Sequence, residues 1–186
     1  MRNEMYLKAG RNSESDECLT PRYAIEPIVK YLKQKNYKRI LCPFDKASSF
    51  YVRVLEANDF DVTYSHKDDK DFFSYTKEDL ESYDCIVSNP PFSIKDKIIQ
   101  RVYDLGKPFM LLFPQQTLQG KFRTSFFINY GMEYLGFDSR VCFYTKNELD
   151  SVKKSNHFAS GYFCHNVLPE KLILEKLVLV NEPYGA

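Results

Sequence analysis

Short apolar runs alternate with segments of helical periodicity over the first two thirds of the chain. Four of the runs predict strands, at 39–42, 60–65, 85–88 and 109–113, of which 39–42 and 85–88 are expected to be buried. The helical segments predicted before and between them lie at 20–34, 48–58 and 93–106. Continuous apolar strands separated by helices are typical of βαβ units, which build a parallel sheet.

The first helical segment carries its own start signals. Thr20 is a natural N-cap, and Pro21 fits the first turn of a helix. Pro27 is expected to kink this helix, because proline removes a backbone donor. The buried stripe of the helix is predicted to consist of Ala24, Ile28, Tyr31 and Leu32.

The rest of the pattern is less regular. Thr76 and Asp79 open the segment 76–83 with a capping-box pattern, which predicts a further helical turn. The elements predicted in the last third are a helix at 119–131, antiparallel strands near 132–146 and 160–167, and a closing helix at 169–180. Three aromatic residues at helical spacing are expected to be core residues, namely Phe126, Phe127 and Tyr130.

These elements predict a single α/β domain. Its expected architecture is a doubly wound, Rossmann-like, mostly parallel sheet with an antiparallel C-terminal part. The domain is predicted to span 20–180, between a mobile N-terminal arm at 1–19 and a C-terminal tail at 181–186. A chain of 186 residues is long enough for one domain with a proper core.

Composition narrows the classes of function. The net charge is +1, from 26 basic and 25 acidic residues, so no global basic field attracts nucleic acid. Nucleic-acid binding would rely on local basic patches at 30–39, 94–101 and 120–123, which solvated helix faces explain equally well. No apolar run is long enough to predict a membrane span, and no signal peptide is recognisable at the start, so we expect a cytoplasmic protein.

Cysteine and histidine usage indicates neither a disulfide framework nor a metal site. The five cysteines are an odd number without a C-x-x-C pair, which favours a reducing compartment. Two of them, Cys42 and Cys85, lie in apolar runs where cysteine acts as a small hydrophobe. The three histidines are too scattered to predict a metal centre.

The stretch DCIVSNPPFSIKDKI, residues 84–98, places two prolines directly after a predicted buried strand. Asn89 is pushed to an extended conformation because it precedes a proline, and Pro90 and Pro91 fix their own φ angles. The result is a stiff corner with two carbonyl oxygens, from the Asn89 side chain and the Pro90 backbone. Phe92 adds a ring face on which a flat base can stack.

Two acceptors and a ring suit one kind of substrate, a planar amino group on an aromatic base. Such a nitrogen is a poor nucleophile because its lone pair is delocalised over the ring. Hydrogen bonds from both N–H groups help the nitrogen to pyramidalise, and the same carbonyls stabilise the positive charge that develops on transfer. This chemistry needs positioning rather than a titratable base. The alternative is a Pro-Pro loop that only ends a strand.

The corner resembles the hallmark of the amino-methyltransferases, (Asp/Asn/Ser)-Pro-Pro-(Tyr/Phe/Trp). The combined string of CPFD, KDFF, SNPPFS-KDKI and GKPF-LL-P is most similar to small phage and prophage proteins related to DNA adenine-N6 methyltransferases. The resemblance covers residues 19–170. It implies S-adenosylmethionine as cofactor and assigns Asn89, Pro90, Pro91 and Phe92 to catalysis.

The resemblance also implies cofactor contacts near the start of the chain. Thr20 and Pro21 match a Thr-Pro pair that touches the cofactor at a helix start. Pro43, Phe44 and Asp45 lie in the loop that follows the first predicted strand, where the family holds its cofactor. Asp45 would take the amino-acid end of that molecule.

A second cofactor contact is implied after the second predicted strand. There KDFF resembles a segment whose acid bonds the adenine amine of the cofactor and whose phenylalanine packs on the adenine ring. These roles carry over to Asp71 and Phe72. The family also has an acidic residue at the end of the second strand that binds the ribose of the cofactor. In this chain Ser65 and His66 occupy that position, and Asp68 or Asp69 could substitute for the acid.

Two further departures from the family affect binding. Lys46, Ala47, Ser48 and Ser49 replace the glycines that let the backbone approach the methionine part of the cofactor. The chain also leaves no room for a separate target-recognition domain. Target specificity would then come from the loops 115–125 and 146–160, or from a protein partner or a homodimer.

The leading hypothesis is therefore an S-adenosylmethionine-dependent methyltransferase that acts on the N6 amine of adenine in DNA, on a flipped or single-stranded base. The alternatives are an RNA base amino-methyltransferase, for guanine N2 or adenine N6, a glutamine methyltransferase of proteins, and an inactive phage-type binding or decoy protein. DNA is favoured over RNA as the partner. Gln115 and Gln116 are candidate readers of the base edge, although a capped helix start explains them better.

Overall fold

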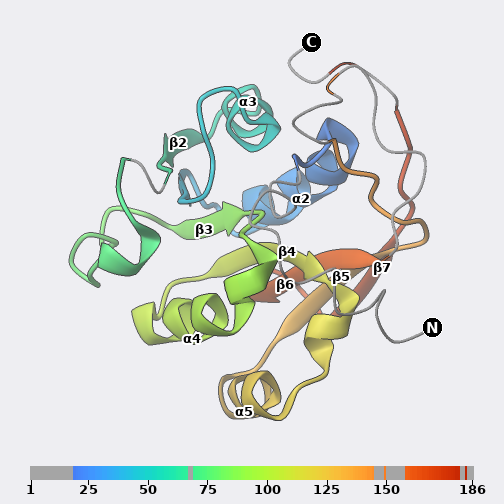
Figure 1. Cartoon of the computed structure of the whole chain (residues 1–186). Helices are drawn as coiled ribbons and strands as arrows, with labels where there is room; N and C mark the ends of the chain where they lie inside the picture. Colours follow the sequence, from blue (N-terminus) through green and yellow to red (C-terminus); the bar gives the residue numbers. More distant parts are fainter. Residues whose placement is uncertain (1–18, 67–68, 145–148, 150–157, 181–182, 184–186) are drawn as a thin grey trace.

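The computed structural model describes residues 19–66, 69–144, 149, 158–180 and 183. Within this part, one sheet has the strand order β2-β1-β3-β4-β6-β5-β7 (Figure 1). The strands are β1 (Arg39–Cys42), β2 (Asp61–Tyr64), β3 (Cys85–Ser88), β4 (Phe109–Pro114), β5 (Glu133–Phe137), β6 (Ser160–His165) and β7 (Leu172–Glu175). The helices are α2 (Arg22–Gln34), α3 (Phe50–Glu56), α4 (Lys95–Leu105) and α5 (Lys121–Tyr130), with short 3₁₀ turns η2 (Phe72–Ser74), η3 (Phe92–Ile94) and η4 (Gln115–Leu118).

The sheet has a parallel half and a mixed half. Strands β2, β1, β3 and β4 pair in parallel, and β6 then pairs antiparallel with both β4 and β5. Strand β7 is the outermost strand on this side of the sheet and pairs in parallel with β5. The predicted α/β fold class, with a mostly parallel sheet and an antiparallel C-terminal part, is confirmed.

Helices cover both faces of the sheet. Helices α2 and α3 lie over one face, and α4 and α5 lie below the other (Figure 1). Two apolar clusters result, because alternate residues of a strand point to opposite faces. Cys42, Cys85 and Tyr162 belong to the cluster under α2 and α3, whereas Leu41 and Ile86 belong to the cluster under α4.

The first helix differs from its prediction at its start. Helix α2 begins at Arg22, and its N-cap is Pro21, with extended φ and ψ of −71° and 152° and no side-chain cap bond. The prediction of Thr20 as the N-cap is therefore wrong, because the extended proline already occupies the cap position. The predicted buried stripe is confirmed, since Ala24, Ile28, Tyr31 and Leu32 are all buried.

The predicted helix at 169–180 is wrong, because β7 occupies part of it. The sequence alternates there, and Leu172 and Leu174 are exposed while Ile173 packs against the core. Pairing with β5 decides the outcome, since a short apolar run fits a strand as well as a helix. The predicted antiparallel strands near 132–146 and 160–167 are confirmed as β5 and β6.

Two other expectations need correction. Thr76 and Asp79 make the reciprocal bonds of a capping box, at 2.9 and 3.1 Å, but turns rather than a helix follow them. Helix α5 contains no fully buried residue, but Phe126 and Phe127 are half-buried and pack against the apolar cluster under α4, so the core prediction fails for Tyr130. Tyr130 is 59% exposed and stacks on Tyr103 of α4 at a centroid distance of 5.4 Å.

The ends of the chain fall mostly outside the described residues. Of the predicted arm only Leu19 is described, and it forms an isolated β-bridge with Tyr144. The predicted tail at 181–186 is described only at residue 183. Among the described residues, no helix is long and apolar enough to cross a membrane.

Candidate functional site

The order of the sheet reverses between β1 and β3. From β1 the chain passes to β2 on one side, and it later returns to place β3 on the other side. In open α/β sheets, ligands bind outside the carboxyl ends of the strands at such a switch point. The segments at this point are the loop 43–49 after β1 and the corner 89–92 after β3.

A buried carboxylate joins these two segments. Asp45 is 8% exposed, and its Oδ1 accepts a hydrogen bond of 2.5 Å from Ser49 Oγ. Its other oxygen, Oδ2, accepts a hydrogen bond from the hydroxyl of Ser88, the last residue of β3. The carboxylate therefore ties the cofactor loop predicted from the sequence to the residue that precedes Asn89.

The environment of Asp45 has opposing electrostatic effects. Burial raises its pKa from the usual 3.8 to about 6, because a charged group is poorly solvated there. The hydroxyls of Ser49 and Ser88 lower the pKa, since they donate hydrogen bonds to the ionised form, but burial has the larger effect. Asp45 thus changes its charge close to neutral pH.

The loop between Pro43 and Ser49 uses ordinary backbone conformations. None of its residues has a positive φ angle. Lys46, Ala47 and Ser48 are exposed, and Ser49 caps α3 by accepting a hydrogen bond from the backbone of Tyr51. The glycine-like backbone freedom that the resemblance associates with this loop is therefore absent from it.

A buried set of hydroxyl groups lies behind this loop. The phenols of Tyr51 and Tyr162 share a hydrogen bond of 2.9 Å, and Tyr162 also donates to the Ala24 carbonyl at 3.0 Å. The Thr20 hydroxyl is buried without a hydrogen bond of normal geometry, although it lies close enough to Tyr51 to influence that phenol. Thr20 thus lies next to the first turn of α3, and its predicted contact with the cofactor stays a prediction.

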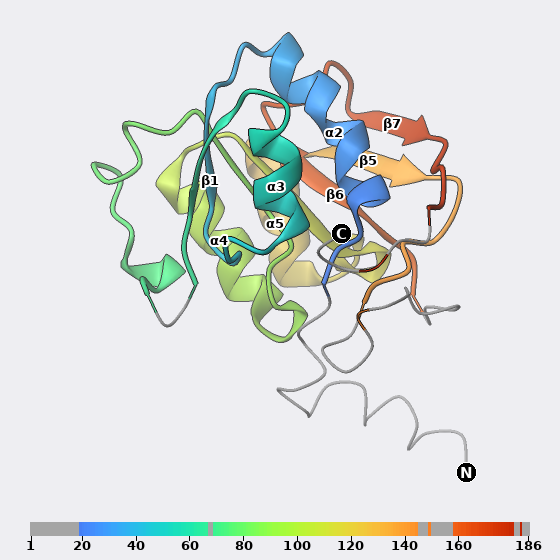
Figure 2. The same ribbon diagram turned by 90° about the horizontal axis from the view of Figure 1, so that it is seen from above.

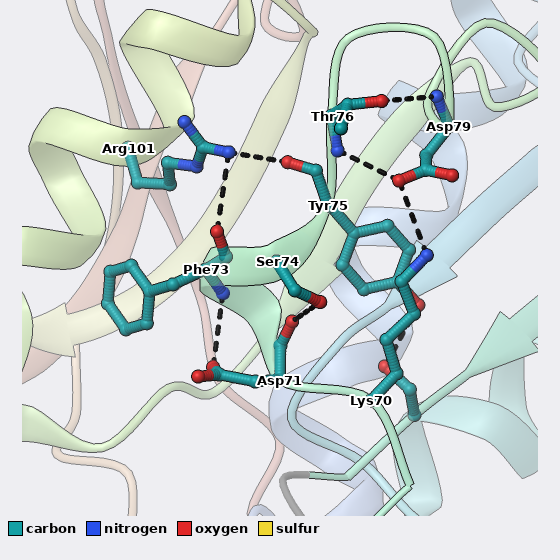
Figure 3. A network of polar contacts seen from close by, with 9 residues as sticks. Lys70, Asp71, Phe73, Ser74, Tyr75, Thr76, Asp79 and Arg101 are labelled. Carbon is teal, nitrogen blue, oxygen red and sulfur yellow. Dashed lines mark hydrogen bonds and ion pairs between the residues drawn. The ribbon is translucent and has the colours of Figure 1, made fainter.

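The segment after β2 supplies the other predicted cofactor residues. Phe72 is 2% exposed, and its ring lies 4.9 Å from that of Phe44, which belongs to the loop after β1. Asp71 is exposed, and its carboxylate accepts a hydrogen bond of 3.1 Å from the backbone of Phe73 (Figure 3). The structure therefore brings Phe44 and Phe72 together, while Asp71 faces solvent next to them.

The neighbouring residues of this segment are held by polar contacts. Arg101 of α4 donates to the backbone carbonyls of Phe73 and Tyr75, at 3.4 and 2.5 Å (Figure 3). The Tyr75 phenol donates a hydrogen bond of 3.1 Å to Ser65, which is buried. Ser65 stands where the resemblance expects an acid for the cofactor ribose. Of the suggested substitutes, Asp69 is exposed and Asp68 lies outside the described residues.

The corner after β3 has the proline backbone angle that its sequence predicts at Pro91. Pro91 has φ and ψ of −62° and 126°, and it is followed by the 3₁₀ turn η3 and then by α4. Pro90 is buried, and Asn89 is half-buried with its Oδ1 covered. Lys95, the first residue of α4, reaches back to the Phe92 carbonyl at 3.3 Å.

Aromatic rings surround the Phe92 side chain. Its ring centroid lies 6.4 Å from that of Phe113, 6.4 Å from that of Phe143 and 5.8 Å from that of Phe158. Phe92 is half-buried and packs against both apolar clusters of the domain. A base that stacks on Phe92 would therefore have to displace part of this packing.

Sequence reasoning missed two residues of this region. Ser88 was treated only as the end of a strand, and Tyr51 lies in a segment with no motif. Their roles depend on pairing between distant elements, which a single sequence does not encode locally. For Ser88 a signal existed, because a polar residue at the buried end of an apolar strand needs a hydrogen-bond partner.

The glutamines proposed as base readers lie in a different environment. Gln115 and Gln116 are exposed in the 3₁₀ turn η4 after β4, rather than at a capped helix start. The backbone of Gln115 donates to Ala159 at 2.8 Å. A pocket of about 180 Å³ borders Gln115, but its other lining residues come from β5, from the loop 138–140, from the start of β6 and from β7, and none belongs to the corner 89–92.

No known family model matches the sequence, and no curated protein matches it. Among solved structures, one match is a Listeria monocytogenes protein described as a "putative class I S-adenosylmethionine-dependent methyltransferase". The two share 12% sequence identity over 92% of this chain and 68% of that protein, with a TM-score of 0.48. Similarity this distant transfers neither residue roles nor an activity.

Proposed function

We propose that the protein is an S-adenosylmethionine-dependent methyltransferase that acts on the exocyclic N6 amine of adenine in DNA. The observation that carries this proposal is the position of the Asn89–Phe92 corner. It follows β3 at the switch point of the sheet, and Ser88 ties it to the loop after β1 through Asp45. A methyl donor held in that loop would lie beside the corner that grips the acceptor.

The residues present fit the amino-acid end of the cofactor. Asp45 offers carboxylate oxygens for an ammonium group, and its two bonds to serines leave acceptor capacity unused. Thr20 offers a buried hydroxyl without a normal hydrogen bond. The exposed carboxylate of Asp71 and the neighbouring rings of Phe72 and Phe44 are proposed for the adenine end. When bound, the cofactor would supply an electrophilic methyl group.

The corner itself would position the acceptor amine. The Asn89 side-chain oxygen and the Pro90 carbonyl would accept its two hydrogen bonds, while Pro91 keeps the corner rigid. Oxygens that are already in place stabilise the positive charge on the nitrogen in the transition state without having to reorganise. This preorganisation lowers the barrier to methyl transfer. Phe92 would stack on the base after the rings around it shift, and the base must first leave its own stack.

One alternative has structural support, namely a non-catalytic binding protein that keeps the fold. The loop after β1 lacks both glycine and positive φ angles, and Asn89 Oδ1 is covered in this structure. RNA base methylation, on guanine N2 or adenine N6, remains the enzymatic alternative, because the corner suits any amino group on a flat base.

Calorimetry with S-adenosylmethionine separates the enzyme from the binding protein. The enzyme proposal predicts measurable binding at millimolar cofactor or below, and undetectable binding would favour the non-catalytic protein. Asn89→Ala is then expected to bind the cofactor almost as well as the wild type and to lose transfer by roughly 100-fold or more, as when one transition-state acceptor is removed. Asn129→Ala, on the exposed side of α5, is the matched control.

A loss of cofactor binding in Asn89→Ala would contradict the assignment of this residue to the acceptor. Unchanged transfer by Asn89→Ala would contradict the catalytic role of the whole corner. Cofactor binding and methyl transfer are measured independently. An error in assigning Asn89 to the acceptor can therefore be distinguished from an error in assigning the corner to catalysis.

A further inference from the structure

Strand β7 forms an open edge of the sheet. It pairs only with β5 among the described strands, and it lies outermost next to β5 and β6 (Figure 2). Its apolar residues are unusually exposed, with Leu172 at 59% and Leu174 at 73%. An exposed apolar edge strand is a template for pairing with another chain.

The open hydrogen-bonding groups of this edge can be assigned. The Tyr134 amide donates to the Lys171 carbonyl at 2.8 Å, and the Asp138 amide donates to the Glu175 carbonyl at 3.0 Å. The backbone groups of residues 171, 173 and 175 therefore point towards β5. Because the direction alternates along a strand, the groups of Leu172 and Leu174 point away from β5 to the open side.

The sequence around this strand is complementary to itself. Residues 170–176 read Glu-Lys-Leu-Ile-Leu-Glu-Lys. When a second copy is laid antiparallel about Ile173, Leu172 faces Leu174. In the same register Lys171 faces Glu175, and Glu170 faces Lys176, so that every charged residue meets one of opposite sign.

Backbone geometry selects the same register. In an antiparallel ladder, residues with outward groups must face each other to exchange their hydrogen bonds. Centring the pair on Ile173 places Leu172 opposite Leu174, and both have outward groups. A pair centred on Leu172 or on Leu174 would also form the backbone hydrogen bonds. The register centred on Leu172, however, places Leu174 opposite Glu170, and the register centred on Leu174 places Leu172 opposite Lys176.

We propose that the protein forms a two-fold symmetric dimer by antiparallel pairing of β7 with β7 of a second copy, centred on Ile173. Two Leu172–Leu174 contacts then cover the exposed apolar side of the edge. Lys171–Glu175 pairs lie on the α2 side of the sheet, where Lys30 and Tyr31 already contact Glu175. Glu170–Lys176 pairs lie on the opposite, exposed side.

The dimer keeps the two candidate active sites apart. Strand β7 runs in the same direction as β4, because β5 and β4 are both antiparallel to β6. In each copy, the candidate site lies at the carboxyl ends of the parallel strands. Because the pairing is antiparallel, these strand ends point in opposite directions in the two copies, so the two sites lie on opposite sides of the extended sheet. The second copy does not complete the site at Asn89, so this inference stands independently of the proposed function.

Charge reversal at the exposed pair tests the dimer. Glu170→Lys places lysine opposite Lys176, and Lys176→Glu places glutamate opposite Glu170. Each change occurs twice in the symmetric dimer, so we expect each single variant to weaken dimerisation by roughly 2- to 30-fold. The double variant Glu170→Lys/Lys176→Glu restores opposite charges and should regain most of the lost affinity.

An equal mixture of the two single variants gives a second form of the rescue. A heterodimer of Glu170→Lys with Lys176→Glu has opposite charges at both pairs, so it should form in preference to either homodimer. Residues 170 and 176 lie beyond opposite ends of β7, so they cannot rescue each other within one chain. The measurement is sedimentation velocity from about 1 μM to 1 mM, the range of weak association.

Leu174→Lys provides a change of a different kind. A lysine on the open edge should abolish dimerisation, because edge lysines block strand pairing. Exposure of 73% at this position keeps the monomer folded, which circular dichroism checks. A wild type that stays monomeric at every concentration would overturn the proposal. So would a dimer that is unaffected by all three single variants, because it would use another surface.

Discussion

At the scale of residues, the connection between Asp45 and Ser88 is the central feature of the candidate site. It joins the loop after β1 to the corner after β3 through a buried carboxylate. The sequence pointed to Asp45 as a cofactor residue, and that role remains a prediction. What the sequence did not indicate is that Ser49 and Ser88 both donate hydrogen bonds to it, because these contacts depend on how the strands pair.

This carboxylate predicts a specific pH dependence of stability. Burial raises the pKa of Asp45 from 3.8 to about 6, so between these values the folded protein retains a proton that the unfolded chain has lost. The stabilising contribution is fully present below pH 4 and is lost as the pH rises through 6. The loss is about 3 kcal/mol, from 1.36 kcal/mol for each pKa unit.

Asp45→Asn should remove this dependence. Urea unfolding at pH 4.5 and 7.5 is expected to show that the stability of the wild type falls more steeply with pH than that of Asp45→Asn. Asp61→Asn, on the exposed edge of β2, is the matched control and should follow the wild type. Equal pH slopes for wild type and Asp45→Asn would show that the folded protein does not retain the Asp45 proton in this range.

At the scale of elements, helix ends show how local sequence determines structure. Gly106 was predicted to end the helix at 93–106, and it lies at the end of α4 with φ of 71° in the left-handed region. A side chain at this position would meet no atom within 4 Å, so only the backbone conformation selects glycine.

Gly106→Ala is therefore expected to destabilise the protein by about 1 kcal/mol, through the left-handed conformation alone. Gly106→Asn should cost less, because asparagine tolerates this region. Urea denaturation of both variants measures the difference. If the two variants were equally stable, steric contacts rather than backbone conformation would have to explain the glycine.

Elements that depend on tertiary contacts were harder to predict. The strands of the parallel half and helices α3 and α4 follow from runs of apolar residues and end signals nearby in the sequence. Strand β7 was predicted as a helix, because its short apolar pattern fits both periods and only pairing with β5 selects the strand. Helix α5 was expected to bury its aromatic residues, but Phe126 and Phe127 are only half-buried and Tyr130 is exposed and stacks on Tyr103.

At the scale of the whole molecule, the sequence predicted the architecture of the sheet but not how tightly the candidate site is covered by other side chains. Alternating strands and helices predicted a doubly wound sheet, and the candidate residues were assigned to the segments that follow β1, β2 and β3. The covering of Asn89 Oδ1 and the rings around Phe92 could not be predicted, because Phe143 and Phe158 come from distant segments. The proposed binding of a base on Phe92 would therefore require these rings to move.

Methyl transfer from labelled S-adenosylmethionine tests the central claim most directly. Purified protein is incubated with single-stranded DNA, duplex DNA, RNA and a protein pool, and the labelled nucleoside or amino acid is identified by mass spectrometry. The account predicts N6-methyladenine in DNA, more in single strands than in duplex, and roughly 100-fold less or lower still with Asn89→Ala. Label in none of the pools, despite measurable cofactor binding, would contradict it.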